Sequence, residues 1–222
     1  MLETRPAEPD IFAQIEALGI LGDGPLVICD VDEVVLHFIA PLEAYMVRCG
    51  FELIEPRFML TGNIRRLDGG GLASQDEVRA LIHGFFETES ESQKPVPHAS
   101  DTLAALSAHA QVLMLTNMPE RFRPAREGIL RRNAIPYPVL TNIGPKGPAV
   151  ATLAGERREP IFFLDDSAGN VTSVRDHVDS AHLIHFIADA RFFALAEPID
   201  GVHHRSNCWR DTRRYIEGVL GI

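Results

Sequence analysis

LVICDVDEVV, residues 26–35, is the stretch that decides the fold of this chain of 222 residues. It begins with an uninterrupted apolar run, residues 26–29, and two carboxylates follow at Asp30 and Asp32. An apolar run of this length bounded by turn residues is typical of a strand buried on both faces, and such strands belong to parallel sheets. Because ligands of parallel α/β sheets bind beyond the carboxyl ends of the strands, this strand would bring two acids to that edge.

Further apolar runs alternate with helical patterns along the rest of the chain. Strands are expected at 112–116, 137–141, 161–165 and 182–187, and helices at 10–18, 101–109, 121–132, 146–153, 170–178 and 211–220. Strands that alternate with helices imply right-handed crossovers. The sequence therefore predicts an α/β fold with a doubly wound, mostly parallel, Rossmann-like sheet. The adjacent His203 and His204 are expected in a surface loop.

Residues 37–98 interrupt this alternation. They contain a helical pattern at 40–47, mixed apolar alternation at 51–67 that suits a hairpin, and a Ser-Gln-Asp-Glu capping box at 74–77 that opens a helix to about residue 87. The tail of the region, residues 87–100, is polar and contains proline, as linkers do. We therefore expect a core built from residues 1–36 and 99–222, with a small, mainly helical cap, residues 37–98, inserted after the first strand.

Composition and charge exclude several classes of partner. The formal net charge of −10 argues against a nucleic-acid or anionic membrane surface, because both require a basic patch. No apolar run approaches the ~20 residues that a membrane-spanning helix needs. Three dispersed cysteines are too few for a disulfide framework. We expect a cytoplasmic protein with neither a nucleic-acid nor a membrane partner.

The expected strand ends and the loops after them carry polar residues of particular kinds. They are Asp30 and Asp32, then Thr116 and Asn117, then Lys146, then Asp165 and Asp166. A carboxylate can attack phosphorus, and a second acid can protonate the leaving group. Converging carboxylates suit Mg²⁺, while a hydroxyl and an ammonium can bind phosphate oxygens. Only two of the 21 basic residues are lysine, so Lys146 is expected to serve where a compact point charge is needed.

The order of these motifs resembles that of the haloacid dehalogenase-like superfamily of hydrolases, over residues 26–178. The resemblance implies Asp30 as the nucleophile and Asp32 as the general acid and base. It also implies that Thr116 binds phosphate and that Lys146 steadies both the nucleophile and the phosphate. Asn117, beside Thr116, is a further candidate for substrate binding.

The same resemblance implies a metal site. Asp165 and Asp166 would hold Mg²⁺ together with Asp30 and the backbone carbonyl of Asp32. Two adjacent acids at the end of an apolar strand also repel each other unless a cation is present. Asn170 is either a cap of the following helix or a residue that supports a metal ligand.

The predicted function is hydrolysis of a small phosphomonoester through an aspartyl-phosphate intermediate, with Mg²⁺ as the cofactor. The acid at Asp32 favours phosphate esters over carbon–halogen bonds, because an alkoxide leaving group must be protonated. Two alternatives stay open. One is a phosphotransferase or phosphomutase with the same motifs, and the other is a non-catalytic module that binds a phosphorylated metabolite or a protein.

Overall fold

A six-stranded parallel sheet forms the centre of the structure, a computed structural model that describes residues 10–19, 22–55 and 60–222. The strand order is β5-β4-β1-β6-β7-β8, and every neighbouring pair in it is parallel. The strands are β1 Leu26–Cys29, β4 Gln111–Asn117, β5 Val139–Asn142, β6 Ile161–Asp165, β7 Ala181–Phe186 and β8 His204–Ser206. The predicted fold class is confirmed.

Strand β1 lies inside the sheet and is buried on both faces, as its apolar run predicts. Cys29 pairs with Met114 of β4 on one side and with Leu164 of β6 on the other. Successive side chains of a strand point to opposite faces. Val27 accordingly packs in one hydrophobic cluster and Ile28 in the cluster on the other face.

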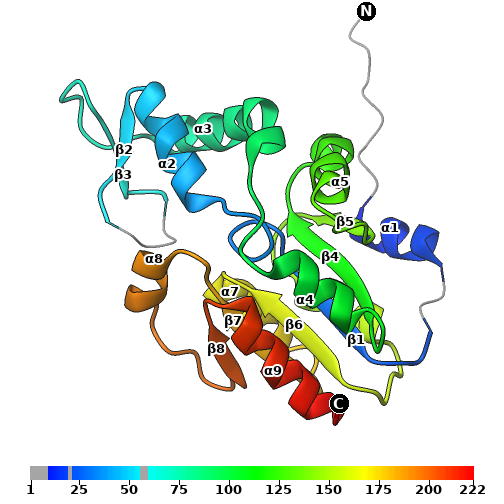
Figure 1. The fold of residues 1–222 in the computed structure, drawn as a ribbon. Helices are drawn as coiled ribbons and strands as arrows, with labels where there is room; N and C mark the ends of the chain where they lie inside the picture. Colours follow the sequence, from blue (N-terminus) through cyan, green and yellow to red (C-terminus); the bar gives the residue numbers. More distant parts are fainter. Residues whose placement is uncertain (1–9, 20–21, 56–59) are drawn as a thin grey trace, which may run out of the picture.

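Helices cover both faces of the sheet (Figure 1). One cluster receives α4 Ala99–Leu106, α5 Arg123–Arg132 and α9 Trp209–Leu220. The other receives α1 Ile11–Leu18, α6 Gly147–Ala154 and α7 Ala168–Arg175. Each of these helices was expected from the sequence to within a few residues. The described part of the chain contains no helix long and apolar enough to cross a membrane.

The insert, residues 37–98, lies beyond the carboxyl ends of the central strands (Figure 1). It contains α2 Ile39–Arg48, the antiparallel hairpin of β2 Phe51–Leu53 and β3 Ile64–Arg66, α3 Gln75–Thr88 and η1 Ser90–Ser92. The capping box at the start of α3 is present, with Ser74 and Glu77 as partners. The insert packs a hydrophobic cluster that also takes in Met118 and Phe122, which follow β4. Its separation from the core as a domain stays a prediction.

Two short elements near the carboxyl terminus were not expected. Strand β8 adds an edge to the sheet through three residues, and His204, expected in a surface loop, is its first residue. The expectation for His204 is therefore wrong. The sequence His-Arg-Ser has no alternation of apolar and polar residues that would predict a strand. Its extended conformation comes from pairing with β7. Helix α8 Ala190–Leu195 follows β7 and begins after an Asp189 cap.

Helix α9 contacts the loop after β1 through the side chain of Trp209. Trp209 is fully buried, and its indole Nε1 donates a hydrogen bond of 2.9 Å to the carbonyl of Val34. Its ring also packs against Phe186, with 5.3 Å between the ring centroids. The carboxyl-terminal helix thereby supports the loop that carries Asp30 and Asp32.

We expect Trp209→Phe to lower the free energy of unfolding by about 1–3 kcal/mol, because the buried Val34 carbonyl loses its donor. Urea denaturation followed by circular dichroism measures the change. Arg214→Ala, at an exposed position of the same helix, is the control and should change stability by less than about 0.5 kcal/mol. Equal effects of the two substitutions would contradict a supporting role for the indole hydrogen bond.

Candidate active site

The carboxyl edge of the sheet brings four of the predicted site residues together. Asp30 directly follows β1, Asp165 ends β6, and Asp166 is the next residue. Lys146 arrives from the loop between β5 and α6. Carboxyl ends of adjacent parallel strands meet at one edge, which is why four residues distant in sequence converge.

Lys146 occupies the centre of this group. Its side chain is fully buried, and its Nζ lies 2.9 Å from Asp30 Oδ1 and 2.7 Å from Asp165 Oδ2. The residue after it has to be glycine, since a Cβ on Gly147 would lie 2.3 Å from the carbonyl oxygen of Ser173. This close approach of α6 to α7 sets the position from which Lys146 reaches the two carboxylates.

Burial and the neighbouring charges both shift the pKa values of Lys146 and the aspartates. Burial on its own lowers the pKa of Lys146, but the carboxylates of Asp165 and Asp30 outweigh it and hold the ammonium charged. Burial raises the pKa of Asp30, against the effect of Lys146. Burial, followed by the negative charges of Asp30 and Asp165, raises the pKa of Asp166 well above its usual value. The site holds more negative charge than one ammonium compensates.

The carboxylates fit a hard divalent cation. Asp30, Asp165 and Asp166 each offer an oxygen, and these three oxygens lie within 4.8 Å of one another. Mg²⁺ prefers carboxylate oxygens, completed by water and phosphate. A cation here would also offset the negative charges of Asp30 and Asp165, which add to the effect of burial on the pKa of Asp166. The donor set and its excess negative charge therefore fit the predicted metal.

Asn170 supports one of these carboxylates. It is the third residue of α7, so it does not cap that helix. Its Nδ2 donates to Asp165 Oδ1 at 3.1 Å, and the backbone N–H of Ser167 donates to the same oxygen at 2.9 Å. Of the two roles left open for Asn170, helix cap or support of a candidate metal ligand, its contact with Asp165 agrees with the second.

Thr116 and Asn117, at the end of β4, differ in what surrounds them. Thr116 is buried, and its Oγ1 has no hydrogen-bond partner within the described ranges. A buried hydroxyl with no protein partner suits a phosphate oxygen. The Nδ2 of Asn117 instead donates to the carbonyl of Gly144 at 2.9 Å, and its Oδ1 accepts from Asn142 at 2.8 Å. Its side chain thus holds the loop that carries Lys146.

The side chain of Asp32 lies apart from the metal-ligand group. Its Oδ2 is 2.9 Å from the guanidinium of Arg126, and its Oδ1 accepts from Gln93 Nε2 at 2.9 Å. Burial raises the pKa of Asp32, while Arg126 opposes that effect. Two acids only two residues apart therefore have separate surroundings.

Comparison with known structures identifies the fold. No family model matches the sequence, and neither does any curated protein. A haloacid dehalogenase-like hydrolase from Streptococcus pneumoniae matches with a TM-score of 0.60 at 9% identity, over 88% of this chain and 100% of that one. The chain has the haloacid dehalogenase-like fold.

Structures with different names share this fold. A predicted phosphoglycolate phosphatase from Haemophilus somnus has a TM-score of 0.59 at 14% identity, over 89% of this chain and 100% of that one. L-2-haloacid dehalogenase from Xanthobacter autotrophicus has a TM-score of 0.57 at 10% identity, over 87% of this chain and 98% of that one. The resemblance noted in the motifs is thus confirmed as a haloacid dehalogenase-like fold.

Sequence reasoning missed Arg126, Gln93 and the role of Glu33. Glu33 is buried and has a φ of 62°, a left-handed conformation that is rare for residues other than glycine. Its Oε2 accepts from the backbone N–H groups of Phe38 at 3.0 Å and Ile39 at 2.7 Å, where α2 begins. An acid shortly before an amphipathic helix is a signal that could have predicted this cap.

We expect Mg²⁺ to raise the free energy of unfolding by about 2.7 kcal/mol when its concentration is a hundred times its dissociation constant. Asp166→Asn should remove most of this gain.

Because the pKa of Asp166 is raised in the folded state, its ionisation destabilises the fold as the pH rises above the usual aspartate range. The metal-free Asp166→Asn protein should therefore be more stable than wild type at pH 7.

Thermal denaturation with and without MgCl₂ measures both effects. Asp179→Asn is the matched control, since Asp179 is exposed and stands outside the carboxylate group. It should respond to Mg²⁺ as wild type does. A wild-type protein that Mg²⁺ does not stabilise would contradict the metal site.

Proposed function

We propose that the chain is a hydrolase of phosphate monoesters that uses Asp30 as a covalent nucleophile and Mg²⁺ as its cofactor. The observation that carries this proposal is the arrangement around Asp30. The Nζ of Lys146 and the backbone N–H of Val31 both bind its Oδ1, at 2.9 Å and 2.7 Å. Within the described part of the chain this leaves Oδ2 for attack on phosphorus, and the hydroxyl of Thr116 is likewise without a partner.

The first step forms a bond between Asp30 Oδ2 and phosphorus and breaks the bond from phosphorus to the ester oxygen. The leaving oxygen takes a proton from the carboxyl group of Asp32. Lys146 and Thr116 bind the phosphoryl oxygens while their charge rearranges. Asp30 then carries the phosphoryl group as an acyl phosphate.

The second step restores the enzyme. Water attacks phosphorus and gives its proton to Asp32, and the bond between phosphorus and Asp30 breaks to release inorganic phosphate. Held by Asp30, Asp165, Asp166 and the backbone carbonyl of Asp32, Mg²⁺ would offset the charge of the phosphoryl group. The protein's own part is to fix these oxygens, through Lys146 and through Asn170 on Asp165.

The proton carrier favours a phosphatase over a dehalogenase. A halide leaves without a proton, so cleavage of a carbon–halogen bond needs no acid at position 32. The insert packs on Met118 and Phe122, directly after β4, and its position beyond the carboxyl edge favours a small phosphorylated metabolite over a macromolecule. We further propose a cytoplasmic location, which suits three free cysteines.

We expect the protein to release phosphate from p-nitrophenyl phosphate in the presence of Mg²⁺. Asp30→Asn should lower kcat by at least about a thousandfold, because an amide is a poor nucleophile. A rapid acid quench with a labelled substrate should trap the phosphoenzyme in wild type and not in the variant. Asp179→Asn should retain full activity.

Other results would favour the alternatives. A wild-type protein that binds Mg²⁺ and turns over no phosphate ester would favour a non-catalytic binding module. Transfer of phosphate to a second substrate in preference to water would favour a phosphotransferase or phosphomutase. An Asp30→Asn variant that keeps its activity would exclude the covalent mechanism.

A further inference from the structure

Two buried side chains, Gln93 and Arg126, form a closed hydrogen-bonded ring with the partly buried Asp32, the proposed proton carrier. Gln93 Nε2 donates to Asp32 Oδ1, and Arg126 donates to Asp32 Oδ2, both at 2.9 Å. A second guanidinium nitrogen of Arg126 donates to Gln93 Oε1, also at 2.9 Å. Each oxygen of the Asp32 carboxylate is therefore held by a different residue, which fixes the plane of the carboxyl group.

Arg126 is unusual among the arginines that the structure describes because it is 0% exposed. It extends from α5, and its guanidinium lies 5.7 Å from the centroid of the Phe86 ring, which belongs to α3 of the insert. Burial of an unpaired charge is costly. Within the described ranges Asp32 is the acid that pairs with Arg126, so the fold places one full positive charge against this carboxylate.

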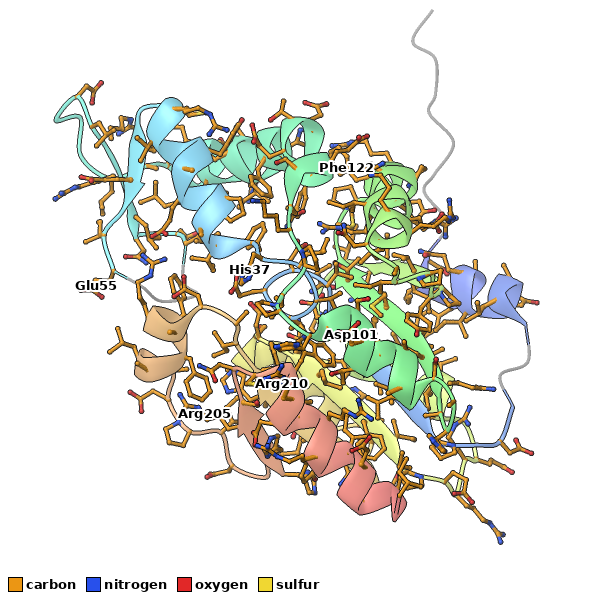
Figure 2. All side chains as sticks on the ribbon, in the orientation of Figure 1. His37, Glu55, Asp101, Phe122, Arg205 and Arg210 are labelled. Carbon is orange, nitrogen blue, oxygen red and sulfur yellow. The ribbon has the colours of Figure 1, made fainter. Side chains whose placement is uncertain are left out.

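Gln93 connects the ring to the insert. It belongs to the segment that leaves the insert, and it is buried although that segment is polar in sequence. Its Nε2 donates to the carbonyl of His37 at 3.0 Å as well as to Asp32. Figure 2 shows His37 where the insert joins the core. The backbone N–H of His37 also donates to the carbonyl of Lys94 at 2.9 Å, so both connecting segments meet at Asp32.

We propose that Arg126 and Gln93 are positioning residues for Asp32 in the hydrolysis of phosphate monoesters. Together they hold the Asp32 carboxyl group where it delivers its proton to the leaving oxygen. Arg126 also lies beside the negative charge that remains on Asp32 once the proton has left. This inference rests on the proposed function, because it assigns roles within that reaction.

A purely structural role would have a different signature. A buried ion pair that only held the insert against the core would affect all substrates alike when broken. A positioning role acts on proton delivery alone. It therefore matters for an alkyl phosphate, whose alkoxide must be protonated, and little for p-nitrophenyl phosphate, whose leaving group departs as a stable anion.

The test compares kcat/KM for an alkyl phosphate and for p-nitrophenyl phosphate, with Mg²⁺, in wild type, Asp32→Asn, Arg126→Met and Gln93→Met. In Arg126→Met we expect a loss of about a hundredfold or more on the alkyl phosphate and less than about tenfold on p-nitrophenyl phosphate. Gln93→Met should show a smaller loss of the same kind. In an Asp32→Asn background, Arg126→Met should no longer change the ratio of the two values.

Arg132→Met is the matched control. Arg132 lies on the same helix as Arg126 and pairs at 3.4 Å with Glu91, which also belongs to the segment leaving the insert. Neither residue contacts Asp32, so the ratio of the two kcat/KM values should stay as in wild type. A changed ratio in Arg132→Met would mean that any contact between α5 and this segment alters proton delivery, which would overturn the specific role of Arg126.

The remaining outcomes separate the two proposals. An active wild type whose Arg126→Met and Gln93→Met variants lose both activities equally would overturn the positioning role and leave the phosphatase proposal standing. A wild type with no activity on either ester would overturn both proposals. If Arg126→Met does not fold, Gln93→Met carries the comparison alone, and an equal loss on both substrates then decides against the inference.

Discussion

The ammonium of Lys146, buried between Asp30 and Asp165, is the interaction on which the site depends. It joins the end of β1, the end of β6 and the start of α6 at one point, at distances of 2.9 Å and 2.7 Å. A buried lysine is stable only with such partners, and buried carboxylates repel each other without it. The same contact thus links the ends of two neighbouring strands and occupies one oxygen of Asp30.

The sequence was sufficient for the parts of the site that rest on local patterns. A buried parallel strand appears as an unbroken apolar run, and the residue after it must lie at the carboxyl edge. This reasoning placed Asp30, Asp165 and the rare Lys146 together, and the structure brings them within direct contact. It also found the Ser74 capping box, because that motif involves residues three positions apart.

The sequence was insufficient where polar side chains are buried by distant partners. Gln93 lies in a polar, proline-containing stretch that predicts a linker, yet it is 3% exposed. Its burial is compensated by Asp32 and Arg126, which are 61 and 33 residues away in the chain. Arg126 stands among several arginines of α5, and nothing local distinguishes the buried one from those that face solvent.

Residues 30–33 show how one turn of chain can give three acids three different surroundings. Asp30 lies beside Lys146 and two further aspartates, Asp32 beside Arg126, and Glu33 at the start of α2. Acids whose environments differ in this way can serve different functions. The left-handed φ of Glu33 turns the backbone so that its carboxylate reaches the helix that enters the insert. Asp32 contacts Gln93 in the segment that leaves the insert. The loop after β1 therefore positions both the carboxylates of the candidate site and the two ends of the insert.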